Sequence, residues 1–153
     1  DEHVSNILAH IGQAQGMAGA LNALPFYAMR HNRLLLPLDA MSKYKVSEQE
    51  VLNVLTNSSS NKKAAPPNLK DAVFEVATSA NDHILAARML IQQFKEQTGG
   101  KTPQSLTLST MGALPTVLFL ERLQKNDFDV LKPQAAEWRL PWRTWRSYRT
   151  KTI

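Results

Sequence analysis

Apolar side chains recur every three or four residues along the first part of the chain, which is the spacing of one face of an α-helix. This pattern predicts a helix from His3 to Leu24, ended by Pro25. Its apolar positions are Val4, Ile7, Leu8, Ile11, Ala14, Ala18 and Leu21. Gly12, Gly16 and Gly19 lie on or near one side of the same helix. Because glycine costs a helix about 1 kcal/mol relative to alanine, we expect another backbone to approach this side closely.

The same spacing is clearest between Leu69 and Phe94, where a single apolar stripe predicts a second long helix. Asn68 is the expected N-cap of this helix, and Gly99 with Gly100 is its expected end. The stripe consists of Leu69, Val73, Val76, Ala80, Ile84, Ala87, Leu90, Ile91 and Phe94.

Local signals predict three shorter helices. Ser47 and Glu50 form a Ser-x-x-Glu capping box that opens a helix through Leu55. Pro115 fits the first turn of a helix that covers residues 114–124, and a short helix is expected at residues 38–43.

The connecting segments are polar, and no segment shows the alternation of a strand. Residues 56–67 are of low complexity and are the expected flexible loop, and residues 126–133 form a second loop. The predicted fold is therefore all-α, a single helical domain over residues 1–153 whose helices pack pairwise around one core.

Composition narrows the classes of site that the chain can carry. Its 153 residues include no cysteine, which excludes disulfides, thiolate nucleophiles and cysteine zinc sites. No run approaches the roughly 18 apolar residues that a membrane span requires, and no targeting peptide is visible. Nucleotide-loop and nucleophile-elbow motifs are absent too.

The histidines and acids favour ordinary structural roles. The four histidines are His3, His10, His31 and His83. None are spaced four apart as a helical metal site requires, and the first two lie about 10 Å apart along a helix. The paired acids, Asp1/Glu2, Glu48/Glu50 and Asp127/Asp129, fall at the chain start, at a helix cap and in a turn. We therefore predict no catalytic residue, no metal site and no cofactor.

Positive charge is concentrated at the end of the chain. The net charge is +5, and residues 138–153 hold four arginines and one lysine without an acid. Without these five, 13 of the 18 basic residues remain against 13 acidic ones, so the tail carries the whole excess.

This tail is the candidate interaction site. Pro141 can begin a helix on which an aromatic stripe, completed by Tyr148, runs beside a cationic stripe. The candidate interface residues are Trp138, Trp142, Arg143, Trp145, Arg146 and Arg149. Tryptophan with arginine suits a membrane interface, an acidic protein partner or nucleic acid. The alternative is that the aromatic rings pack on the domain and the arginines are simply solvated.

A motif near the start of the chain resembles the squalene/phytoene synthase family. The matching residues are Gly12, Ala14 and Leu21 on the first helix, then Arg33, Leu36 and Pro37 as Arg-x-x-Leu-Pro. The resemblance implies the C-terminal half of an isoprenoid-synthase-type helical bundle, part of a longer fold. In family enzymes this helix carries two acids that hold magnesium and the substrate diphosphate. The aligned positions are Ala23 and Tyr27, and residues 3–38 contain no Asp or Glu.

The chain also resembles a branch of that family that acts in assembling mitochondrial respiratory complex I, the NADH dehydrogenase. The shared features are the order and spacing of segments 10–16, 33–39, 46–52 and 127–129 and a final Trp-Arg. The resemblance implies a non-catalytic scaffold on the matrix side of the inner membrane. Its implied partners are complex I subunits or other assembly factors, together with a peripheral contact to anionic membrane. No nucleic acid is expected. Two alternatives stay open: a head-to-head prenyl synthase, and a non-catalytic isoprenoid- or lipid-binding protein.

Overall fold

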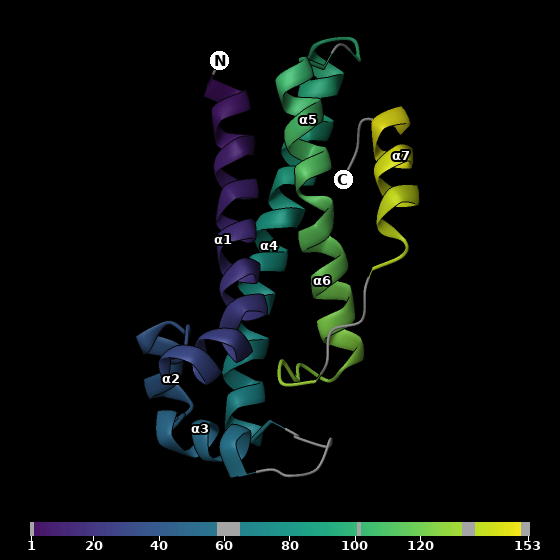
Figure 1. The fold of residues 1–153 in the computed structure, drawn as a ribbon. Helices are drawn as coiled ribbons and strands as arrows, with labels where there is room; N and C mark the ends of the chain where they lie inside the picture. Colours follow the sequence, from purple (N-terminus) through teal and green to yellow (C-terminus); the bar gives the residue numbers. More distant parts are fainter. Residues whose placement is uncertain (1, 58–64, 101, 133–136, 151–153) are drawn as a thin grey trace.

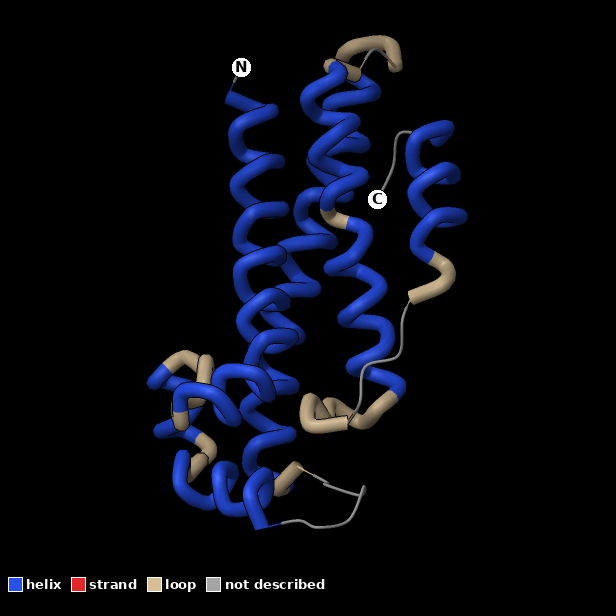
Figure 2. The backbone as a smooth tube through the Cα atoms, viewed as in Figure 1, coloured by secondary structure: helices blue, strands red, loops and turns tan. Residues whose placement is uncertain are grey.

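The computed structural model describes residues 2–57, 65–100, 102–132 and 137–150, and every regular element within these ranges is a helix (Figures 1 and 2). The helices are α1 (Glu2–His31), α2 (Leu38–Lys43), α3 (Glu48–Asn57), α4 (Pro67–Gln97), α5 (Gln104–Gly112), α6 (Leu114–Lys125) and α7 (Leu140–Thr150). The predicted all-α fold is confirmed. Most of the predicted flexible loop, residues 58–64, lies outside the described part of the chain.

The two long helices α1 and α4 lie side by side and make the most extensive helix–helix contact of the described residues (Figure 1). Most positions of the two predicted apolar stripes are buried between these helices, and Val4, Leu8 and Leu90 are partly buried. One half of the interface contains Ile7, Ile11, Ala14, Ile84, Ala87 and Ile91, and the other contains Ala18, Leu21, Leu24, Leu69, Ala72 and Val73. No helix among the described residues combines the length and apolar character needed to cross a membrane.

The shorter helices cover this pair. α2 and α3 lie beside the end of α1 and contribute Ala40 and Val51 to the core (Figure 1). The hydroxyl of Ser47 accepts a hydrogen bond from the Glu50 N–H at 3.4 Å, which is one of the two hydrogen bonds of the predicted capping box. α6 packs on both long helices, and α7 packs against α5 and α6.

Pro25 does not end the first helix, contrary to the prediction. It lies inside α1, which continues to His31. A proline within a helix costs about 3 kcal/mol, because it lacks an N–H and its ring crowds the carbonyl one turn back. Leu24 and Ala28 are fully buried on the same stripe as Leu21. Burying one leucine gains about 1.5–3 kcal/mol, so core packing on both sides of Pro25 offsets its cost.

Asn68 is not the N-cap of α4, which was a second wrong prediction. The helix begins at Pro67, whose fixed φ suits the first turn and whose missing N–H needs no partner. The Asn68 side chain instead donates to the carbonyl of Lys45 at 3.2 Å. The predicted C-terminal signal is confirmed. Gly99 and Gly100 have φ values of 61° and 84°, and the Gly100 N–H donates to the carbonyl of Lys95 at 2.8 Å.

The sequence pattern predicted no helix where the structure has α5. The buried face of this helix consists of Leu106, Thr107 and Thr110, so two of its three positions are polar. Each hydroxyl bonds to a backbone carbonyl nearby in the chain: Thr107 to Pro103 at 3.3 Å and Thr110 to Thr107 at 2.7 Å. Threonine can therefore occupy the buried face of a helix. Because threonine counts as polar, the apolar spacing that predicts a helix is then missing from the sequence.

The expected close approach at the three glycines of α1 is wrong. Gly12, Gly16 and Gly19 are all exposed, and a Cβ atom built on any of them meets nothing within 4 Å. The buried face of α1 is formed by its isoleucines, leucines and alanines, and the glycines lie on the opposite, open side.

We therefore expect Gly16→Ala to raise the free energy of unfolding by about 0.5–1 kcal/mol, because alanine adds helix propensity without a clash. Urea unfolding followed by circular dichroism measures the change. Gly99→Ala is the matched control and should destabilise the protein, since its φ of 61° disfavours any side chain. A lower urea midpoint for Gly16→Ala would show that this side of α1 is covered.

Candidate functional site

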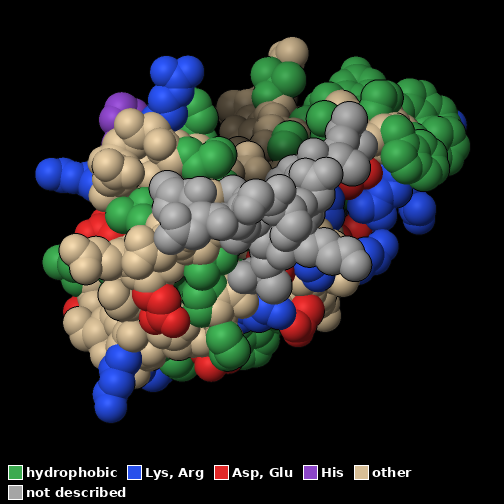
Figure 3. Space-filling view, turned by 60° about the horizontal axis from the view of Figure 1, so that its bottom comes forward, with side chains coloured by type: hydrophobic (Ala, Val, Ile, Leu, Met, Phe, Trp, Pro, Cys, Tyr) green, Lys and Arg blue, Asp and Glu red, His purple; other side chains and the backbone are tan. Residues whose placement is uncertain are grey.

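The aromatic side chains of the predicted interface lie largely in solvent. The exposed fractions are 82% for Trp138, 61% for Trp142, 49% for Trp145 and 60% for Tyr148. Within α7 the buried residue is Ser147. Hydrophobic side chains accordingly gather at the edge of the molecule where α7 lies, beside a group of Lys and Arg side chains (Figure 3). The rings are thus available to a partner and do not fill the core.

The exposed rings are ordered against one another. Trp142 and Trp145 stack with their centroids 5.0 Å apart and an interplanar angle of 28°. The guanidinium carbon of Arg149 lies 5.0 Å from the centroid of the Trp145 ring. At this distance the negative face of the aromatic ring attracts the guanidinium cation. The surface therefore presents an aromatic stack with a cation held beside it.

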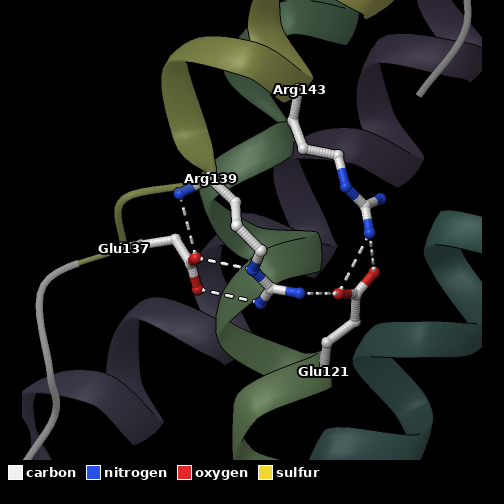
Figure 4. Close-up of polar contacts among 4 residues, drawn as sticks. All are labelled: Glu121, Glu137, Arg139 and Arg143. Atoms are coloured by element: carbon white, nitrogen blue, oxygen red, sulfur yellow. Dashed lines mark hydrogen bonds and ion pairs between the residues drawn. The ribbon is translucent and has the colours of Figure 1, made fainter.

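Two other arginines attach this segment to α6 (Figure 4). Arg139 donates from Nε to Glu137 Oε1 at 2.8 Å and from Nη1 to Glu121 Oε2 at 3.5 Å. Arg143 donates from Nη2 to both oxygens of Glu121, at 3.1 and 3.2 Å. Glu121 therefore joins two arginines from α7 and the turn before it to the body of the molecule.

The electrostatics of this cluster agree with its geometry. The hydrogen bond from Arg139 lowers the pKa of Glu137 from 4.5 to about 2 against the opposing effect of desolvation. The same hydrogen bond raises the pKa of Arg139. Both groups thus stay ionised near neutral pH, and two of the positive charges in the tail are matched locally by Glu121 and Glu137.

The candidate cations consequently fall into two kinds. Arg143 is partly buried and paired with Glu121, so it positions α7. Arg146 and Arg149 are exposed, and the ion pairs among the described residues include neither of them. Sequence spacing predicted the cationic stripe but not Glu121, because nothing in a helix sequence shows which distant segment will lie opposite an acid.

The residues of the family motif have structural positions. Ala14 and Leu21 are buried in the α1–α4 core, and Gly12 is exposed. Leu36 is buried, Pro37 is the N-cap residue of α2, and Arg33 is exposed. Ala23 is half-buried and Tyr27 is exposed on α1, and no group of three or more His, Cys, Asp or Glu gathers among the described residues.

The loop acids serve the fold, as predicted. Asp129 is fully buried and accepts the N–H of Leu131 at 3.1 Å, which is an Asx-turn. Its other oxygen accepts the N–H of Ala65 at 3.2 Å, and Asp127 pairs with Lys70 at 2.9 Å. These contacts tie the loop after α6 to the start of α4.

Two further features were not apparent from the sequence. His10 of α1 and His83 of α4 meet with their Nδ1 atoms 2.9 Å apart. A cleft of about 260 Å³ lies between α4 and α6, and its lining includes Phe74, Arg88 and Leu120. Small-molecule sites usually span about 300–1,000 Å³, and this cleft is slightly smaller than that range.

Comparison with known proteins identifies the family. The profile of squalene/phytoene synthase matches residues 1–146. The chain belongs to the squalene/phytoene synthase family. Curated relatives include proteins named "NADH dehydrogenase (ubiquinone) complex I, assembly factor 6". The relative from Bos taurus is 28% identical over 133 residues, which are 87% of this chain and 34% of that protein. The Homo sapiens relative is 26% identical over the same shares.

A further relative of this family, the Drosophila melanogaster homolog of that assembly factor, is 28% identical over 128 residues, 84% of this chain and 33% of its own length. The chain thus spans about a third of the curated relatives that it matches. No solved structure matches the chain. The predicted family is confirmed. Whether this chain shares the activity of the full-length relatives is addressed as a proposal below.

The depressed pKa of Glu137 gives a pH-dependent prediction. Its pKa is 4.5 in the unfolded chain and about 2 in the folded one, so its contribution to stability is present above pH 4.5 and is lost as the pH falls toward 2. Glu137→Gln should therefore lower the urea midpoint near pH 7, and the difference from wild type should shrink through this window. The tryptophan fluorescence of this segment reports the transition. In an Arg139→Gln background the same substitution should have little effect, and an equal effect there would contradict the pairing.

Proposed function

We propose that this chain is a non-catalytic assembly factor for mitochondrial respiratory complex I. The observation that carries the proposal is its similarity, over 84–87% of its length, to relatives named as complex I assembly factor 6. The family profile extends across the α1–α4 pair. Complex I subunits or other assembly factors are then the expected partners.

The chemistry of α1 supports a role without catalysis. A magnesium–diphosphate site needs carboxylate oxygens, because Mg²⁺ takes hard oxygen ligands. By resemblance those carboxylates belong at Ala23 and Tyr27, and no Asp or Glu occurs between His3 and Leu38. An isoprenoid diphosphate therefore finds no magnesium ligand on this part of the helix. The prenyl synthase alternative would need its metal ligands elsewhere.

We further propose that the exposed face of α7 docks on an anionic membrane, on the matrix side of the inner membrane. Four exposed aromatic rings and two exposed arginines occupy one short helix and the turn before it. Tryptophan and tyrosine favour the interface between lipid and water, and arginine favours anionic headgroups. The charge match and the apolar rings together favour lipid over an acidic protein.

Removal of the gene in its source organism should lower assembled complex I, because complex I is the assembly target of the proposal. Native gel electrophoresis of mitochondria measures the loss, with complex II as the control. The wild-type gene should restore complex I. Normal complex I after removal would exclude the assembly role.

The purified protein should also form no condensation product from farnesyl diphosphate with Mg²⁺, and a product would favour the synthase alternative.

Changing Arg146 and Arg149 to Gln should weaken binding to anionic vesicles about thirtyfold, since each cation near such a surface contributes about 1 kcal/mol. Changing Trp142 and Trp145 to Ala should weaken it at least as much. Sedimentation with phosphatidylcholine vesicles that contain or lack cardiolipin measures the binding. Both variants should keep the melting temperature of wild type, because these side chains are exposed.

A matched control removes exposed apolar surface on another helix. Phe26 and Met29 of α1 are 52% and 62% exposed, and their double change to Ala should leave vesicle binding intact. Unchanged binding in both α7 variants would reject the membrane contact and favour an acidic protein partner. A large drop in melting temperature for the tryptophan variant would show that the rings pack on the body.

A further inference from the structure

His10 of α1 and His83 of α4 are 73 residues apart in the sequence, yet their imidazole rings meet across the helix pair. The Nδ1 atoms are 2.9 Å apart, the ring centroids are 5.1 Å apart, and the rings are tilted by 41°. Both residues are half-buried at the margin of the α1–α4 core. Their immediate helical neighbours in that core are Ile7, Ile11, Ala14, Ile84 and Ala87. Packed helices therefore hold both rings in place.

The two Nδ1 atoms face each other across a hydrogen bond. A hydrogen bond between them requires one ring to donate and the other to accept, so at least one Nδ1 presents a lone pair. Among the described residues neither ring makes another hydrogen bond, and no third His, Asp or Glu completes a cluster with them. The pair is thus two convergent nitrogen donors without a carboxylate.

We propose that His10 and His83 form a two-histidine binding site for a divalent transition-metal ion, with Cu²⁺ preferred. Imidazole nitrogen is a usual ligand for copper, nickel and zinc. On binding, the donor ring moves its proton from Nδ1 to Nε2, so that both Nδ1 lone pairs face the ion and no net proton is released. Water, or donor atoms from another molecule, fills the remaining coordination positions.

The distance between the nitrogens selects the ion. Two nitrogens at about 2.05 Å from a metal are about 2.9 Å apart when they subtend a right angle, and about 3.3 Å apart at the tetrahedral angle. The observed separation is 2.9 Å. A right angle is the arrangement of tetragonal Cu²⁺ or Ni²⁺, whereas tetrahedral Zn²⁺ would need the two nitrogens about 0.4 Å further apart. The general order of affinities also places Cu²⁺ highest.

The site exists only in the folded chain, because 73 residues separate its two ligands. An ion that binds the folded state alone shifts unfolding in proportion to the logarithm of its concentration. The ion would thus act as a cross-link between the two central helices. This inference is independent of the role in complex I assembly.

The chain allows a clean test because it has four histidines in total. His3 and His31 are exposed single histidines that would bind Cu²⁺ adventitiously, and changing both to Ala leaves only His10 and His83. In this background we expect one Cu²⁺ per chain by calorimetry and a melting temperature that rises with Cu²⁺ concentration. The electron paramagnetic resonance spectrum should show two imidazole nitrogens on the copper.

His10→Gln and His83→Gln, each made in that background, remove one ligand while keeping a polar side chain. Each should weaken Cu²⁺ binding and abolish the rise in melting temperature, because one imidazole cannot join the two helices through the ion. Zn²⁺ should bind more weakly than Cu²⁺ to the parent. Equal Cu²⁺ affinity in the two Gln variants and the parent, or fewer than two nitrogens in the parent spectrum, would overturn the proposal. The spectrum of the parent decides the matter even if a Gln variant fails to fold.

Discussion

The packing of α1 on α4 is the constraint on which the other features of the structure depend. Alanines such as Ala14, Ala18, Ala80 and Ala87 are buried along this interface, and their small side chains let the two helices approach closely. Isoleucines and leucines fill the space between them. Once this pair is fixed, α6 has a surface on which to pack, the loop at Asp129 can tie down the start of α4, and the two histidines are brought together.

Periodicity predicted the two long helices because α1 and α4 bury one stripe each, and a buried stripe leaves a period in the sequence. The wrong predictions lie where tertiary packing outweighed a local rule. Pro25 is kept inside α1 by buried leucine and alanine on both sides, and threonines replaced apolar residues on the buried face of α5. The prediction of a close backbone approach at the glycines of α1 was wrong for a different reason. Exposed and buried glycines look alike in a sequence, and here the apolar face is the opposite one.

The sequence predicted which residues make up the candidate site on α7. It did not predict which acids pair with the arginines there. Tryptophans and arginines at helical spacing are enough to identify residues 140–150 as an amphipathic helix. Glu121 and Glu137, which neutralise Arg139 and Arg143, are ordinary surface acids in the sequence. The His10–His83 contact likewise depends on the relative rotation of two helices. Such pairings follow from how elements meet in space, and a single sequence does not specify them.

The division of the arginines changes which force should dominate at the α7 surface. The sequence alone shows a tail with a strong positive excess, which suggests an electrostatic contact. In the structure two of those charges are matched by acids, and within α7 Arg146 and Arg149 remain exposed, worth about 1 kcal/mol each beside an anionic surface. Four exposed rings remain as well, and burying about 100 Å² of each would contribute about 2.5 kcal/mol per ring. Burial of the aromatic rings therefore outweighs charge severalfold. The contact should be only moderately sensitive to salt, because screening acts on the smaller of the two contributions.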